Sequence, residues 1–72
     1  MNLDKILEDL AKHGIYVNKD KINLMRYLLQ EDGTELYIIY FENYKAHIKI
    51  FTDNTVRVYT YPIMYSKKKQ SG

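Results

Sequence analysis

The feature that most constrains this chain is residues 35–61, where β-branched and aromatic residues follow one another with only two short polar interruptions. This composition favours strands over helices. Eight of the ten aromatic residues, counting eight Tyr and two Phe, lie between Tyr37 and Tyr65. The stretch therefore predicts consecutive strands of one antiparallel sheet, with apolar side chains on both of its faces.

One helix is predicted before the sheet, over residues 2–13. Apolar residues recur there at helical spacing and form a single stripe, made of Leu3, Ile6, Leu7, Leu10 and Ala11. Asn2 is suited to cap the N-terminus, and Gly14 follows the C-terminus. The predicted fold class is α+β, with one N-terminal helix packed on an antiparallel meander of three to four strands.

Residues 22–30 are compatible with two structures. Asp32-Gly33 between two apolar runs is typical of a hairpin turn, which favours a strand and pairs Leu29 with Leu36. The alternative is a second helix, giving two helices followed by a three-stranded sheet. Residues 19–31 would then resemble the recognition helix of a winged-helix DNA-binding protein.

Alternation along the strands predicts which residues share a face. One predicted face is aliphatic and receives the helix, with Leu36, Ile38, Tyr40, Ile48, Ile50, Val56 and Val58. For the last strand this requires a three-residue loop or a bulge near Asp53-Asn54. The opposite face is aromatic and mildly basic, and its predicted interface residues are Tyr37, Ile39, Phe41, Phe51, Tyr59 and Tyr61.

Length and charge limit the possible partners. The 72 residues predict a single domain over 1–65 and a disordered basic tail over 66–72. The net charge is +2, but removing Lys67, Lys68 and Lys69 leaves eight basic and nine acidic residues in 1–66, a net charge of −1. A near-neutral domain favours a protein partner over nucleic acid.

Residues for catalysis or metal binding are sparse. The only serines, Ser66 and Ser71, lie in the tail, there is no Cys, and His13 and His47 have no ligand spacing. We therefore predict a protein without enzymatic activity, with no catalytic, cofactor-binding or metal-binding residues. The longest apolar run, residues 36–41, is far shorter than the roughly 20 residues that span a bilayer. A cytoplasmic protein without a membrane segment is expected.

The predicted function is that of a small accessory or binding protein that forms a homodimer through the aromatic face or through an edge strand, with a further protein partner possible. An exposed apolar face of this kind usually marks an interaction surface. The alternative is a module that binds single-stranded nucleic acid, in which bases stack on the aromatic residues. Its candidate contacts are Lys49, Arg57, Lys67, Lys68 and Lys69.

A capped helix at residues 2–13, followed by Gly14 and a tyrosine-rich meander, resembles the small YopT-like proteins of Bacillus prophages. The resemblance covers residues 2–61 and concerns architecture and size, without a diagnostic motif. It implies one helix with three strands and a homodimer of phage or prophage origin. It implies no functional residues.

Overall fold

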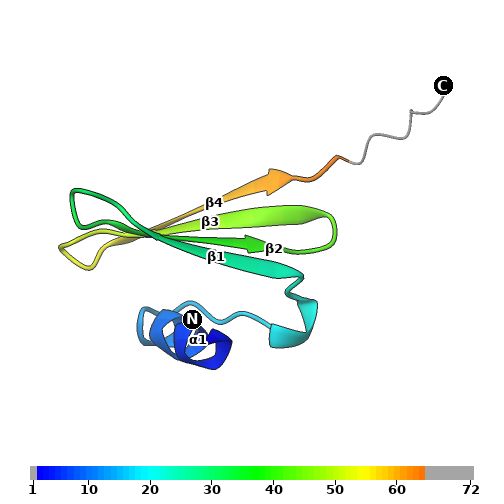
Figure 1. Ribbon diagram of the computed structural model, residues 1–72, viewed down its shortest axis with the longest axis horizontal. Coiled ribbons are helices and arrows are strands. Elements are labelled where there is room, and N and C mark those ends of the chain that lie inside the picture. Colours follow the sequence, from blue (N-terminus) through cyan, green and yellow to red (C-terminus); the bar gives the residue numbers. More distant parts are fainter. Residues whose placement is uncertain (1, 65–72) are drawn as a thin grey trace, which may run out of the picture.

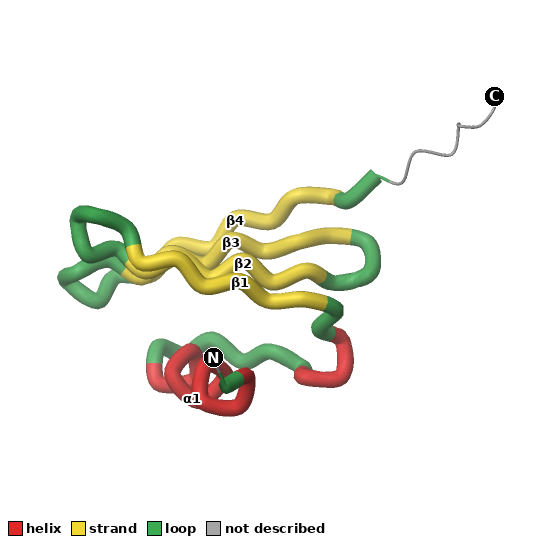
Figure 2. Tube along the Cα trace, viewed as in Figure 1, coloured by secondary structure: helices red, strands yellow, loops and turns green. Residues whose placement is uncertain are grey.

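The computed structural model describes residues 2–64. Its elements are α1 (Leu3–Lys12), the short 3₁₀ helix η1 (Lys19–Lys21), β1 (Leu24–Leu29), β2 (Glu35–Tyr40), β3 (Tyr44–Ile50) and β4 (Val56–Pro62). The strands form one antiparallel meander in the order β1-β2-β3-β4, and α1 lies on one side of it (Figures 1 and 2). The predicted α+β class is confirmed. The predicted tail at 66–72 lies outside the described residues.

Helix α1 begins and ends as its sequence predicts. The Asn2 side chain accepts hydrogen bonds from the backbone N–H groups of Asp4 at 2.9 Å and Lys5 at 3.3 Å. His13 caps the C-terminus, and Gly14 follows with φ +81°, a conformation that costs glycine little. Ile6 and Leu10 are the buried residues of the apolar stripe.

Residues 24–29 form a strand, so the second helix and the winged-helix arrangement are wrong. Residues 19–31 hold only the single turn η1 before β1 starts. The predicted hairpin is confirmed, but its register is not. Gln30 N–H donates to Thr34 O at 2.9 Å, Gly33 N–H donates to Gln30 O at 3.0 Å, and Gly33 has φ +89°. This three-residue loop pairs Leu29 with Glu35 instead of Leu36.

The next turn determines which side of β2 faces the helix. Phe41 N–H donates to Tyr44 O at 2.8 Å, leaving a tight two-residue turn at 42–43. Tyr37 therefore pairs with Ile48, so odd-numbered residues of β2 share a face with even-numbered residues of β3. The predicted faces of β2 are reversed as a result. A one-residue change of register moves every side chain of a strand to the opposite face.

The last hairpin agrees with the sequence prediction. Phe51 N–H donates to Thr55 O at 2.9 Å, and Asn54 has φ +70° in the three-residue loop between them. Ile50 therefore pairs with Val56 on the helix side. The buried core comprises Ile6, Leu10, Tyr37, Ile39, Ile48 and Ile50.

Candidate binding surface

The sheet face opposite α1 has no described element packed on it (Figure 2). We call it the open face. Pairing and alternation place three residues of each strand there. Its twelve residues are Leu24, Arg26, Leu28, Leu36, Ile38, Tyr40, Lys45, His47, Lys49, Arg57, Tyr59 and Tyr61.

The centre of the open face is shielded by its own neighbours. Leu36 and Ile38 in β2 are only 9% and 7% exposed, although no described element lies above them. Side chains of the flanking strands cover them. Apolar exposure is concentrated towards the two edges, at Leu24 and Leu28 on one side and at Tyr59 and Tyr61 on the other. The exposed apolar groups of this face are therefore scattered rings and methyl groups and not one continuous apolar patch.

Cations alternate with these rings. The Lys45 ammonium lies 5.7 Å from the ring centroid of Tyr40 and 5.8 Å from that of Tyr61. The Lys49 ammonium lies 5.8 Å from the ring of Tyr59. With Arg26 and Arg57, the open face has four cations, and none of its twelve residues is Asp or Glu.

The carboxylates of the chain lie on the helix side or in loops. They are Asp4, Glu8, Asp9, Asp20, Glu31, Asp32, Glu35, Glu42 and Asp53. Asp32, in the β1–β2 loop, is close enough to the open face to interact electrostatically with Lys49. Its pKa is lowered, mainly by hydrogen bonds from Thr34 and to a smaller extent by Lys49. The near-neutral net charge of the domain is thus the sum of a basic open face and an acidic set of residues elsewhere.

His47 is the polar group at the centre of this surface. Its ring makes an edge contact with Tyr61 at 4.8 Å, and its Nε2 is buried without a hydrogen-bond partner. Burial lowers the pKa of His47, and Lys45 and Lys49 lower it further. The neutral imidazole is therefore favoured, and it adds a further flat ring to the surface.

The predicted interface residues divide between the two sides of the sheet. Tyr59 and Tyr61 lie on the open face, and Phe51 follows β3 at a position of the same face. Tyr37 and Ile39 do not, because they are 3% and 0% exposed in the core beneath α1. This part of the prediction is wrong.

Phe41 also belongs to the helix side. It packs against the core and stacks on Tyr44 at 4.7 Å. In β2, the residues that the sequence prediction missed are Leu36, Ile38 and Tyr40, which the reversed register of this strand brings to the open face. The two-residue turn after Phe41 was the signal that could have identified them.

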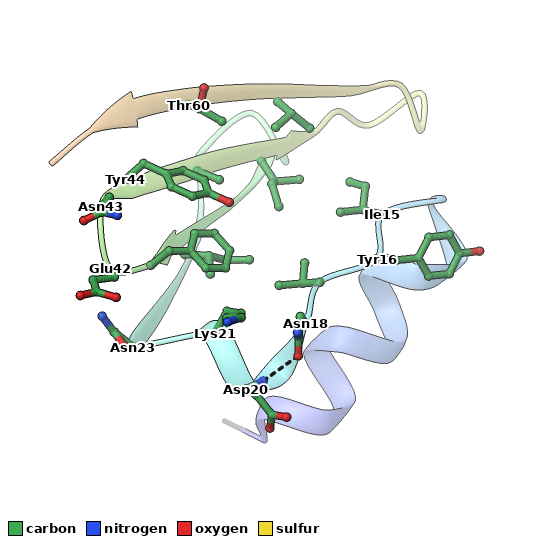
Figure 3. Close-up of a pocket in the computed structure, with 16 residues that line it drawn as sticks. Ile15, Tyr16, Asn18, Asp20, Lys21, Asn23, Glu42, Asn43, Tyr44 and Thr60 are labelled. Carbon is green, nitrogen blue, oxygen red and sulfur yellow. Dashed lines mark hydrogen bonds between the residues drawn. The ribbon is translucent and has the colours of Figure 1, made fainter.

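A groove of about 750 Å³ lies on the helix side, between residues 15–23 and strands β2 to β4 (Figure 3). Its floor is apolar and includes Ile48 and Val58. Its rim is polar, and the Asn18 side chain there accepts a hydrogen bond from Asp20 N–H at 3.0 Å. The groove is open to solvent, and Val58, its β4 residue, is 52% exposed.

Residues 2–64 contain no group of three metal-ligating side chains and no helix long and apolar enough to cross a membrane. Comparisons with protein-family models, curated proteins and solved structures found no match to this chain. The resemblance to YopT-like proteins stays a prediction. The four strands agree with the predicted hairpin and exceed the three that the resemblance implies.

Proposed function

We propose that this protein binds single-stranded nucleic acid on the open face. The observation that supports the proposal is the interleaving of four cations with three tyrosines on a surface that has no carboxylate. Bases stack on aromatic rings, and phosphates bind to Lys and Arg. Tyr59 and Tyr61 are 38% and 44% exposed, so their rings are accessible for stacking.

The shape of the surface favours a single strand over a duplex. Reading a duplex by its bases requires a helix or a two-stranded ribbon that enters the major groove, and the open face is the broad side of a four-stranded sheet. A single strand can place its unpaired bases flat on such a sheet. We therefore expect binding with little sequence preference.

Self-association through the same face, which the sequence predicts, is less well supported. A twofold dimer would bring the four cations of one copy against the four of the other, and like charges in an interface are unfavourable. The surface therefore suits a polyanion better than a second copy of itself. A second copy fits the free edge of β4, where backbone groups are unpaired.

The test is fluorescence anisotropy of a labelled oligothymidylate across a range of salt concentrations. Four phosphate contacts predict a slope of about −2.8 in log K against log salt, or about a 50-fold loss between 50 and 200 mM. Lys45→Gln/Lys49→Gln should reduce the slope to about −1.4. The matched control, Lys5→Gln/Lys12→Gln, removes the same charge from α1 and should bind like wild type.

Two further variants separate the contributions of the tail lysines and of base stacking to the binding affinity. Lys67→Gln/Lys68→Gln/Lys69→Gln measures what the tail adds. Tyr59→Leu keeps an apolar side chain but removes the ring, and should weaken binding by the ~1–3 kcal/mol of one stacked base, about 5- to 150-fold. No binding at low salt would refute the proposal, as would equal loss in the Lys45/Lys49 and Lys5/Lys12 variants. Equal affinity for polyglutamate would indicate an acidic protein partner instead.

A further inference from the structure

Strand β4 is at the edge of the sheet, and its outward backbone groups can be identified. Phe51 N–H donates to Thr55 O, and Ile63 N–H donates to Asn43 O. In an antiparallel ladder, hydrogen-bonded and non-hydrogen-bonded pairs alternate. Odd-numbered residues of β4 therefore bond to β3, and the N–H and C=O groups of the even-numbered residues, from Val56 to Thr60, point away from the sheet.

This edge lacks the features that usually prevent strand pairing. Natural edge strands are protected by lysines, prolines, bulges or covering segments. The outward residues Val56, Val58 and Thr60 are β-branched and uncharged, and Val58 is 52% exposed. Pro62 lacks an N–H and lies only at the end of the strand. Among residues 2–64, nothing covers β4 on this side (Figures 1 and 2).

The opposite edge of the sheet is less accessible. In β1, Gln30 N–H donates to Thr34 O, so the outward groups belong to odd-numbered residues such as Met25 and Tyr27. Both side chains pack partly against the helix-side core. An approaching strand would meet a less open edge there than at β4.

We propose that two copies of this chain pair antiparallel through their β4 edges, with Val58 at the twofold axis. This register pairs Val58 with Val58 of the second copy, and Val56 with Thr60, forming about six backbone hydrogen bonds. It places Arg57 opposite Tyr59 of the second copy, a favourable cation–aromatic pair. Moving the axis to Arg57 would set two arginines directly opposite each other.

The twofold axis of this pairing is perpendicular to the sheet, so the two open faces lie on the same side. Two four-stranded sheets become one of eight strands, and at about 4.8 Å per strand the joined face is about 38 Å wide. The use of this face rests on the proposed function, whereas the pairing itself does not. A dimer would bind a long single strand more tightly than one copy, because both faces engage the same molecule.

The first test is sedimentation of the full chain and two proline variants. We expect wild type at twice the chain mass of 8.7 kDa and Val58→Pro at the single mass. Proline fits an edge position whose N–H faces outward, so Val58→Pro should keep the fold. Leu29→Pro places proline at an outward position of β1 and should stay dimeric. A monomeric wild type, or a dimeric Val58→Pro variant, would overturn the proposal.

Amide hydrogen exchange of wild type avoids dependence on any variant. The N–H groups of Val58 and Thr60 should be protected at high protein concentration and exchange rapidly after dilution. The N–H of Tyr59, bonded within the sheet, should stay protected at both concentrations. Rapid exchange of Val58 and Thr60 at every concentration would contradict the pairing.

Oligonucleotide binding separates this inference from the proposed function. Val58→Pro should bind an oligothymidylate of about 8 nucleotides like wild type and lose at least about tenfold for one of about 24 nucleotides. A β4 dimer that binds neither oligonucleotide would leave the pairing intact and refute nucleic-acid binding. A monomeric wild type that binds both oligonucleotides would refute the pairing and leave nucleic-acid binding intact.

Discussion

Gly33 is the residue on which the register of β1 and β2 depends, and Gly33→Ala should destabilise the protein by about 2 kcal/mol. A residue with a side chain at φ +89° costs roughly 1–2 kcal/mol, partly offset by the lower entropy of the unfolded alanine chain. An added Cβ would lie 2.8 Å from Thr52 Cγ2, so Thr52 must leave its rotamer, at about 1 kcal/mol. For a domain this small, the melting temperature should fall by roughly 8–16 °C.

Gly14→Ala is the matched control, because Gly14 has a similar φ of +81° and an added Cβ would meet nothing within 4 Å. It should cost about 1 kcal/mol, or roughly 4–8 °C. Thr52→Ser removes the obstructing methyl group. In the Thr52→Ser background, Gly33→Ala should therefore lower the free energy of unfolding by only about 1 kcal/mol, as Gly14→Ala does. Thermal and urea unfolding followed by circular dichroism measure these differences. Equal costs for the two glycines, with no relief from Thr52→Ser, would refute the close approach of the two loops.

Three further changes test other parts of the structure. Asn2→Ala should cost about 1 kcal/mol of unfolding free energy through loss of the helix cap, measured by urea unfolding. Tyr37→Phe removes the hydroxyl that donates a hydrogen bond to Asp9 at 2.9 Å, and it should lower the free energy of unfolding by about 1–3 kcal/mol. Tyr40→Phe, on the open face, should change the free energy of unfolding by less than about 0.5 kcal/mol. The pKa of His47 is lowered from 6.5, so on acidification the unfolded chain binds this proton before the folded chain does. Stability should therefore fall as the pH decreases below 6.5. In unfolding measured across pH, His47→Gln should lack this step.

The fold could largely be predicted from the sequence because its signals are local. The apolar stripe around Leu10, the capping residues of α1 and the turn residues before each strand act within a few positions of one another. The strand at 24–29 is harder to predict, because its residues also suit a helix. The Asp32-Gly33 pair between two apolar runs favours the hairpin, and Gly33 does adopt the positive φ that such a turn uses.

The faces could not be predicted as reliably, because each depends on the number of residues in a loop. Asp32-Gly33 is typical of a two-residue turn, yet the chain uses three residues there and pairs Leu29 with Glu35. β2 is apolar on both sides, so its own pattern does not indicate which side faces the helix. Tyr37 and Ile38 are both suitable for a core, and only the paired strands determine which of them lies beneath α1.

The reversed face of β2 also changes which partner the protein suits. With Tyr37 in the core and Tyr40 on the open face, Lys45 lies between the half-buried ring of Tyr40 and the exposed ring of Tyr61. Net charge could not indicate this, because the acidic side chains of α1 and the loops cancel the basic face in the sum. A binding partner experiences the local charge within about one Debye length, roughly 8–10 Å, and not the total. At that range the open face is positive, and this is the physical reason for proposing a polyanion with stackable bases, and not an identical face, as its partner.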